Sequence, residues 1–523
     1  MPPRLRYPTK DTTGSQSMSE HDQNDLEDRL HRLNQIGILL SSNQRDIEGL
    51  LQQILIEARS FTKAEAGTLY LLEGEALSFA FAQNDRLDIT STSSEQPSLP
   101  PVPLNKDSVS GYVALTGESL NVTDVYDESA HQWEGPKNYD RLMGYRTQSM
   151  LVVPMKDHEG SVLGVLQLLN AMGKNEKYTS FSVEDETLIQ SLASQAAVAI
   201  NNTRLIRDME SLFDSFVQVM ATAIDERSPY TGGHIRRVAA LTMIMAETVN
   251  CTKEGPFADY YFTDDELREL HMAAWMHDVG KITTPEWIVD KPTKLTSILD
   301  RIELVRMRFV NMRQHVELMQ ARGEIDSEDA LQELSAIDED WSFVERANHP
   351  TESFSDKDIE RLRRIGKRTL FIDGEEIPCI SPEELRHLCI RKGSLSDDER
   401  LKINDHAAVS IRMLSQIPFT SKLKKVPEIA GAHHEKLDGS GYPLGLAGEE
   451  INLQARILAM ADIFESLSAD DRPYRDQPLS REKVFSIVKT MVDSGHLDAD
   501  LYALFLTEGL YKKFDSIKKH RFD

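Results

Sequence analysis

Two adjacent histidines, His433 and His434, are the residues of this sequence that most directly suggest chemistry. They are followed by Glu435, by Asp438 and by the glycine-rich run GSGYP at 439–443. If the two imidazoles are buried, all four ring nitrogens need partners. A solvated polar loop is the alternative interpretation of this stretch alone, so the rest of the chain has to decide.

Other potential ligands interrupt apolar helical patterns. His277 and Asp278 follow the apolar run MAAWM, and Lys281 lies one helical turn further along. Asp462 interrupts the apolar pattern ARILAMADIFESL. A buried imidazole or carboxylate is costly unless it is hydrogen-bonded or binds a metal. For Asp462, the alternatives are a backbone cap or an ion pair with Arg456.

Two further histidines extend the set. His234 follows SPYTGG and opens a helical pattern, and His406 lies in LKINDHAAVSIRML; either one alone can be a solvated first-turn residue. The combined candidate ligands are His234, His277, Asp278, His406, His433, His434 and Asp462. Nitrogen and oxygen ligands without thiolate suit Fe, Mn, Zn, Ni or Co. The set predicts two metals that share a bridging carboxylate, an arrangement suited to phosphodiester cleavage.

Composition limits the class of protein. The chain of 523 residues carries a formal net charge of −26, so it lacks the basic footprint of general nucleic-acid binding. Cys251, Cys379 and Cys389 are scattered and form no zinc or disulfide pattern. No run approaches the roughly 18 to 20 apolar residues of a membrane span, and the N-terminal segment lacks the apolar core of a signal peptide. We therefore expect a cytoplasmic protein without a membrane span.

Apolar periodicity predicts two kinds of domain. Short strand-like segments occur at 67–72, 76–82, 119–125, 148–155 and 162–170, between helical patterns at 29–60 and 182–227. From about residue 210 onward, helical patterns dominate. The expected fold is an α+β domain, with an antiparallel sheet flanked by helices, joined by a long helix to an all-α domain. The expected boundaries are a disordered tail at 1–28, the first domain at 29–204, a connecting helix at 205–228, and a second domain at 212–523 with a helical insertion at about 296–396.

The second half resembles an HD-GYP domain, a branch of the HD phosphohydrolase superfamily. The motifs that carry the resemblance are YTGGHIRRVAAL, MHDVGKITTPEWIVDKPTKLT, SLSDDERLKINDHAAVSIRML, AHHEKLDGSGYPLGL and ARILAMADIFESLSADDRPYR. They occur in order over about residues 212–480, apart from the stretch after Thr296. The resemblance implies hydrolysis of cyclic di-GMP, a bacterial second messenger, to pGpG and in some members onward to GMP.

The resemblance also implies roles for individual residues. One metal would be held by His234, His277, Asp278 and Asp462, and a second, bridged by Asp278, by His406, His433 and His434. Fe and Mn are the favoured ions. Asp278 and Lys281 would be the catalytic pair, with Lys281 on the scissile phosphate. The substrate-binding residues would be Lys281, Asp438, Tyr442, Arg472 and Arg475. Some members hold a third metal through a glutamate four residues before the first histidine, but Tyr230 occupies that position here.

The first half resembles a GAF domain, a sensory module that binds small molecules. The resemblance rests on DSVSGYVALTGESLNVTDV, MLVVPMKDHEGSVLGVLQLLN and FSVEDETLIQSLASQAAVAINN. Asn170, Phe181, Asp185 and Glu186 fit the N-K…F-x-x-x-D-E pattern of cyclic-nucleotide-binding members, but Ala171 replaces the lysine. The acidic pair can also simply start a helix, where carboxylates favour the dipole.

These observations predict a cyclic di-GMP phosphodiesterase regulated by a GAF sensor with an unidentified ligand. The alternatives are hydrolysis of another cyclic dinucleotide such as 3′,3′-cGAMP, an adaptor that binds GGDEF-type diguanylate cyclases through the GYP loop, and a diiron oxygenase. Helices at the ends of the GAF domain suggest a parallel homodimer.

Overall fold

The computed structural model describes residues 47–92, 101–127, 133–173, 177–226, 233–351, 353–372, 375–469 and 477–519. The expected N-terminal tail, the start of the first expected helix, Tyr230, Arg472 and Arg475 lie outside these residues. The chain divides into two compact units, Met1–Ser211 and Leu212–Asp523. No helix of the described part is long and apolar enough to cross a membrane.

The first unit is built on an antiparallel sheet with the strand order β3-β2-β1-β7-β6-β5, in which β4 also pairs with β2 and β8 with β7. The strands are β1 (Ala64–Glu73), β2 (Ala76–Asn84), β3 (Ile89–Thr92), β4 (Val102–Pro103), β5 (Leu120–Val122), β6 (Met150–Lys156), β7 (Val162–Met172) and β8 (Tyr178–Thr179). Gly74, with φ +61°, forms the tight β1–β2 turn in a conformation that favours glycine.

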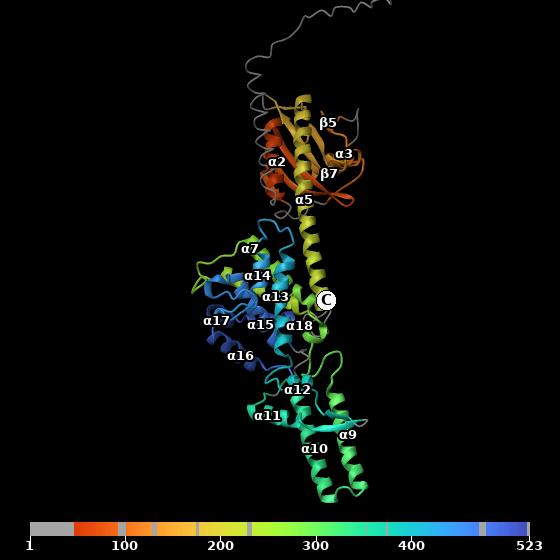
Figure 1. Ribbon diagram of the computed structural model, residues 1–523. Coiled ribbons are helices and arrows are strands. Elements are labelled where there is room, and N and C mark those ends of the chain that lie inside the picture. Colours follow the sequence, from red (N-terminus) through yellow and green to blue (C-terminus); the bar gives the residue numbers. More distant parts are fainter. Residues whose placement is uncertain are drawn as a thin grey trace, which may run out of the picture. The chain divides into compact units, whose positions relative to one another are not determined.

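Side-chain alternation gives this sheet two covered faces. On β6, Leu151 and Val153 join a core with helices α2 (Ile47–Thr62) and α5 (Val183–Asp225), which cover one face (Figure 1). Met150 and Val152 point to the other face and pack with α3 (Val109–Thr116). Helix α4 (Glu134–Met143) also lies on that side. Helix α5 begins in the first unit and ends in the second.

The second unit is mostly helical. Its main core is formed by α6 (His234–Cys251), α7 (Asp264–Met276), α14 (Val426–Gly431), α15 (Leu453–Ser468), α16 (Arg481–Asp493), α17 (Ala499–Thr507) and α18 (Leu510–Lys519). The short elements η1 (Val279–Thr283), α8 (Glu286–Val289) and η2 (Gly448–Glu450) and the helix α13 (Asp397–Leu414) complete this part. The predicted fold class, an α+β domain followed by a helical domain, is confirmed.

The segment between α8 and α13 forms a subdomain with its own apolar core. It contains α9 (Ile302–Ala321), α10 (Ser327–Asn348), α11 (Asp356–Ile365), β9 (Thr369–Ile372), β10 (Glu375–Pro378) and α12 (Pro382–Leu388). Helices α9 and α10 pack against each other (Figure 1). The β9–β10 pair was not anticipated, because its two strands are only four residues each and β10 contains two glutamates and a proline.

Candidate metal centre

The structure brings the seven candidate ligands together from five helical elements. His234 begins α6, His277 and Asp278 follow α7, and His406 lies in the middle of α13, where it is buried rather than in a solvated first turn. His433 and His434 follow α14, and Asp462 lies within α15. Three overlapping groups have ligand atoms within 4.8 Å of one another: His406/His433/His434, His234/His277/Asp462 and His277/Asp278/His433.

The backbone fixes the orientation of three imidazoles in the same way. The Nδ1 atoms of His277, His406 and His433 each lie within hydrogen-bonding distance of the carbonyl three residues earlier, at Ala274, Ile403 and Ala430. Their tautomers therefore place the lone pair on Nε2. In the described part of the chain, these three buried Nε2 atoms and Oδ1 of Asp278 have no hydrogen-bond partner. Buried polar atoms without partners are rare, and this convergent set fits a divalent cation.

His234 is oriented by a carboxylate instead. Its Nδ1 lies 2.5 Å from Oε2 of Glu465, which is fully buried on α15. The other oxygen of Glu465 accepts a hydrogen bond from Nε of Arg237 at 2.7 Å. A carboxylate behind a histidine is the usual second layer of a metal site. Sequence reasoning missed Glu465, although it is a second charge in the apolar pattern that had drawn attention to Asp462.

The electrostatics favour the protonation states that metal ligands need at Asp278, His433 and His434. At His234 and His277 burial lowers the pKa, but the neighbouring carboxylates outweigh it and raise that pKa, so a metal would have to displace protons there. Burial raises the pKa of Asp278, but Lys281 and His277 outweigh it and hold that pKa well below its usual range. Nζ of Lys281 lies 2.5 Å from Oδ2 of Asp278. Burial lowers the pKa of His434 to about 3 and that of His433 well below its usual value. Both histidines are therefore neutral at pH 7, and Asp278 is ionised.

Close packing explains why residue 280 of the HDVGK segment, residues 277–281, is a glycine. A Cβ on Gly280 would lie 2.0 Å from the carbonyl oxygen of His406, so only glycine lets η1 lie directly on α13. The amide of Gly280 donates to Oγ of Ser410 at 2.9 Å, and that hydroxyl donates to the carbonyl of His277 at 2.9 Å. Ser410 thus connects the segment that carries Asp278 to the helix that carries His406.

Glu435 holds the GYP loop. Its buried carboxylate accepts the backbone N–H groups of Leu444, Gly445 and Leu446 at 2.6, 3.2 and 3.0 Å. A Cβ on Gly441 would lie 2.5 Å from Cα of Glu435, so glycine is required there as well. The ring of Tyr442 lies 4.9 Å from that of His434. The loop is therefore packed against a candidate metal ligand.

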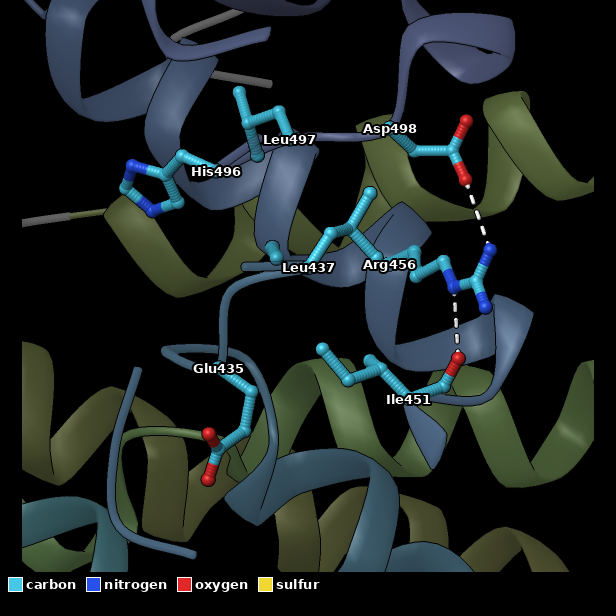
Figure 2. A pocket seen from close by; sticks show the side chains of 8 residues that line it. Glu435, Leu437, Ile451, Arg456, His496, Leu497 and Asp498 are labelled. Carbon is cyan, nitrogen blue, oxygen red and sulfur yellow. Dashed lines mark hydrogen bonds and ion pairs between the residues drawn. The ribbon is translucent and has the colours of Figure 1, made fainter. Parts of the chain in front are cut away.

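Figure 2 shows a small pocket lined by Glu435, Arg456 and Asp498 among others. Arg456 binds the carboxylate of Asp498 at 3.1 Å and the carbonyl of Ile451 at 2.7 Å. Arg456 therefore forms an ion pair with Asp498. The carboxylate of Asp462 instead lies 3.3 Å from Nε2 of His234.

Asp438, predicted to bind substrate, has a local role. Its exposed carboxylate accepts the N–H of Ser440 at 2.8 Å, and its own N–H donates to the carbonyl of Gly495 at 2.9 Å. These bonds shape the turn that precedes Gly441. The remaining predicted substrate residues, Arg472 and Arg475, lie outside the described part.

The nucleotide-binding pattern proposed for the first unit is also used structurally. The side chain of Asn170 donates to Glu65 at 3.0 Å and to the carbonyl of Arg146 at 2.9 Å. Asp185 accepts the N–H of Ser182 at 3.0 Å and so caps the start of α5. This geometry supports the simpler interpretation, in which the acidic pair starts a helix.

Comparison with known proteins agrees with both resemblances. The GAF domain family matches residues 46–200, and HD domain families match residues 231–333 and 379–501. The chain therefore contains a GAF domain followed by an HD domain, as the motifs predicted. HD domains are metal-dependent hydrolases, and the unpartnered imidazole nitrogens agree with divalent-metal binding.

The curated relatives include phosphodiesterases of cyclic dinucleotides. The chain is 42% identical over 122 residues to the 3'3'-cGAMP-specific phosphodiesterase 1 of Vibrio cholerae, covering 23% of this chain and 26% of that protein. It is 27% identical over 229 residues to the cyclic di-GMP phosphodiesterase response regulator RpfG of Xanthomonas campestris, covering 41% of this chain and 57% of that protein. The chain thus spans about a quarter to somewhat over half of these relatives.

Proposed function

We propose that this protein is a cytoplasmic, metal-dependent phosphodiesterase that hydrolyses cyclic di-GMP to pGpG, with GMP as a further product to be tested. The observation that carries the proposal is the convergence of three unpartnered imidazole nitrogens and one carboxylate oxygen beside Lys281. No simple structural role explains these buried polar atoms, whereas a phosphodiesterase metal centre uses all of them.

In this proposal, His234, His277, Asp278 and Asp462 would hold one metal, and Asp278, His406, His433 and His434 would hold a second. Two divalent ions, with Fe or Mn favoured, would supply an activated water and neutralise charge on the phosphoryl group. Lys281 donates a hydrogen bond to a phosphoryl oxygen, since its ammonium lies beside the bridging carboxylate. Tyr442 borders the substrate beside His434.

Charge supports this assignment. An anionic dinucleotide is repelled by a chain with a formal net charge of −26, unless positive charge is concentrated where it binds. Two divalent cations and Lys281 provide that concentration. Arg472 and Arg475 are proposed to add contacts to phosphate or guanine.

Anaerobic incubation of the purified chain with cyclic di-GMP and Fe(II) or Mn(II), followed by chromatography of the products, tests the function. Asp278→Ala should abolish turnover, and Asp265→Ala on the surface of α7 should not. Formation of pGpG or GMP by the parent and by Asp265→Ala, but not by Asp278→Ala, supports both the activity and the role of Asp278. Absence of turnover with metal bound contradicts the assigned substrate.

A second substrate is favoured by the relatives that act on 3'3'-cGAMP. The same centre would cleave either dinucleotide, and competition between the two in one reaction ranks them by kcat/KM. An adaptor that binds diguanylate cyclases has no need for seven convergent ligands. A diiron oxygenase would consume oxygen, which an oxygen electrode detects.

We propose further that the GAF domain binds a small molecule and acts through a parallel homodimer. Helix α5 carries large apolar side chains that are 52% to 71% exposed, at Val198, Leu205, Met209, Leu212, Phe216 and Val219. Their alternating spacing of three and four residues, with Asn202 between the first two, is a coiled-coil seam. In an in-register parallel dimer, two copies of the Leu205→Cys variant should form a disulfide with each other. The control Arg207→Cys lies off the seam and should stay reduced. A monomer in sedimentation would contradict the dimer.

A further inference from the structure

One face of α13 carries three buried polar side chains at intervals that keep them aligned. Glu399, His406 and Ser410 are seven and four residues apart, which places them on the same side of the helix. Ser410 fixes one end of this row through its hydrogen bonds to the HDVGK segment. His406, a candidate metal ligand, lies between Ser410 and Glu399. The position of His406 therefore depends on what holds Glu399.

Glu399 is held by a buried lysine. Nζ of Lys291 lies 2.7 Å from Oε1 of Glu399, and the lysine side chain is 1% exposed. The other oxygen of Glu399 accepts the N–H of Ser396 and closes the capping box that starts α13. Because any shift of α13 would leave the ammonium of Lys291 buried without its partner, the pair defines one position of the helix.

The insertion takes part in the same contact. Lys291 precedes the insertion and Glu399 follows it, 108 positions later. His387 of α12, inside the insertion, places Nε2 at 3.6 Å from the same Oε1 of Glu399. The chain beside Lys291 is also bound to the insertion, since the N–H groups of Lys294 and Leu295 donate to the backbone and side-chain carbonyls of Asn348 at 2.9 and 2.8 Å.

We propose that Lys291 and Glu399 are positioning residues for His406, and that the insertion stabilises this position through His387. The inference rests on the proposed metal centre, because its consequence is the integrity of the ligand group His406/His433/His434. In this proposal the insertion stabilises the position of α13, the helix that carries His406, in addition to any role as a binding surface.

Metal content of the full-length protein tests the proposal independently of turnover. Lys291→Met should weaken binding of one of the two metals, because His406 is then less firmly positioned, and metal analysis after dialysis should fall from two ions per chain towards one. Substrate turnover is not needed for this measurement. If the parent protein binds two metals tightly but hydrolyses no dinucleotide, the proposed function is contradicted, whereas the positioning role of Lys291 and Glu399 can still be tested.

Two further variants separate positioning from stability. The double variant Lys291→Met/Glu399→Met removes both charges, so it should recover most of the thermal stability lost in the single variant. The double variant should not recover the lost metal affinity, because two methionine side chains can pack together in many geometries and so do not define one position of α13. The matched control is Arg368→Met, which removes a partly buried cation inside the insertion, paired with Asp340 at 2.9 Å. This control should lower stability and keep both metals.

The contribution of the insertion is tested by His387→Asn. A several-fold lower affinity for the second metal supports a role of the insertion in positioning His406. Wild-type affinity in this variant would restrict the proposal to Lys291 and Glu399. Wild-type affinity for both metals in the folded double variant would overturn the proposal altogether, because the ion pair would then be structural only.

Discussion

Glu465 and His234 form a direct contact between α15 and α6, with Oε2 of the carboxylate 2.5 Å from Nδ1 of the imidazole. The opposite ring nitrogen, Nε2, faces Asp462 at 3.3 Å and Asp278 at 3.6 Å. The pair joins residues 231 positions apart in the chain. It therefore fixes which nitrogen of His234 can bind a metal.

Replacing this carboxylate should weaken the metal centre. We expect Glu465→Gln to reduce metal affinity by about 10- to 100-fold, because the amide orients the imidazole less strongly than the carboxylate does. Metal titration followed by atomic absorption measures the change. Glu482→Gln, at an exposed helix start, is the control and should bind metal normally. Equal affinities in the two variants would show that Glu465 serves only to neutralise Arg237.

A methyl group at Gly280 should separate two parts of the site. Gly280→Ala places a Cβ where the carbonyl oxygen of His406 lies, so η1 or α13 must move. We expect a loss of about 1–3 kcal/mol in the free energy of unfolding, typical of overpacking, together with loss of activity. Chemical denaturation measures the first quantity. In Gly366→Ala the new Cβ meets the movable end of Leu385 at 2.9 Å, and the nearest backbone atom, the carbonyl oxygen of Leu362, is at 3.4 Å, so a similar loss in both variants would contradict the steric argument.

The GYP loop should affect substrate binding more than metal binding. Glu435→Gln weakens the three backbone hydrogen bonds that hold residues 444–446. We expect KM to rise with two metals retained, because the loop is proposed to border the substrate while the candidate metal ligands keep their own anchors. Steady-state kinetics alongside metal analysis checks this. Loss of metal in parallel with the rise in KM would show that the loop also supports His434.

The insertion contains a carboxylate whose contribution to stability should depend on pH. Burial raises the pKa of Glu384, but the Arg308 guanidinium, 2.6 Å away, outweighs it and lowers that pKa. Because the pKa is lower in the folded state, the ionised carboxylate stabilises the folded protein at pH values above the unfolded-state pKa of about 4.3. This stabilisation is lost as the pH falls through the folded-state pKa. Glu384→Gln should therefore cost about 1.5–3 kcal/mol at pH 7 and progressively less below pH 4.

The neighbouring Glu383 is the control for this titration. It pairs with Arg301 at 3.1 Å, but its side chain is 60% exposed. An exposed pair contributes at most about 1 kcal/mol. Denaturation of both variants between pH 3 and pH 7 should separate them, and a Glu384→Gln effect that stays constant over this range would contradict the ion pair as its cause.

The two cysteines of contrasting burial should differ in reactivity. Burial raises the pKa of the Cys379 thiol to about 11, whereas Cys251 is exposed. Since the thiolate is the reactive form, a thiol reagent at pH 8 should label Cys251 in the folded protein and Cys379 only after unfolding. Mass spectrometry of the labelled peptides identifies the sites. Rapid labelling of Cys379 in the native state would show that the insertion opens.

The sequence carried enough information for the fold class and for the candidate ligand set. His277, Asp278 and Asp462 stand out because each is a polar residue within an apolar helical pattern, and burial there needs a reason. The anchors behind them could not be found in the same way. Glu465 contacts His234 across 231 positions and Ser410 contacts His277 across 133, so their partners follow only from the packing of helices.

The same limit applies to the insertion. Its length and charge were evident, and the sequence placed it between the two halves of the metal-binding pattern. Nothing local indicated that Lys291 and Glu399, on either side of it, form a buried pair. Likewise, the spacing of His406 allowed a solvated first turn, and only the packing of α13 on η1 shows that it is buried.

The contact across the insertion has a consequence for how the chain folds. Lys291 and Glu399 must meet across 108 positions, and closing a disordered loop of that length is slow and entropically costly. The insertion has an apolar core of its own, so its folding can bring the two flanking segments together first. Helix α13, which carries the candidate ligand His406, would then dock onto ends that are already close. A slow or misfolded insertion would delay assembly of the metal centre even though none of the seven candidate ligands belongs to it.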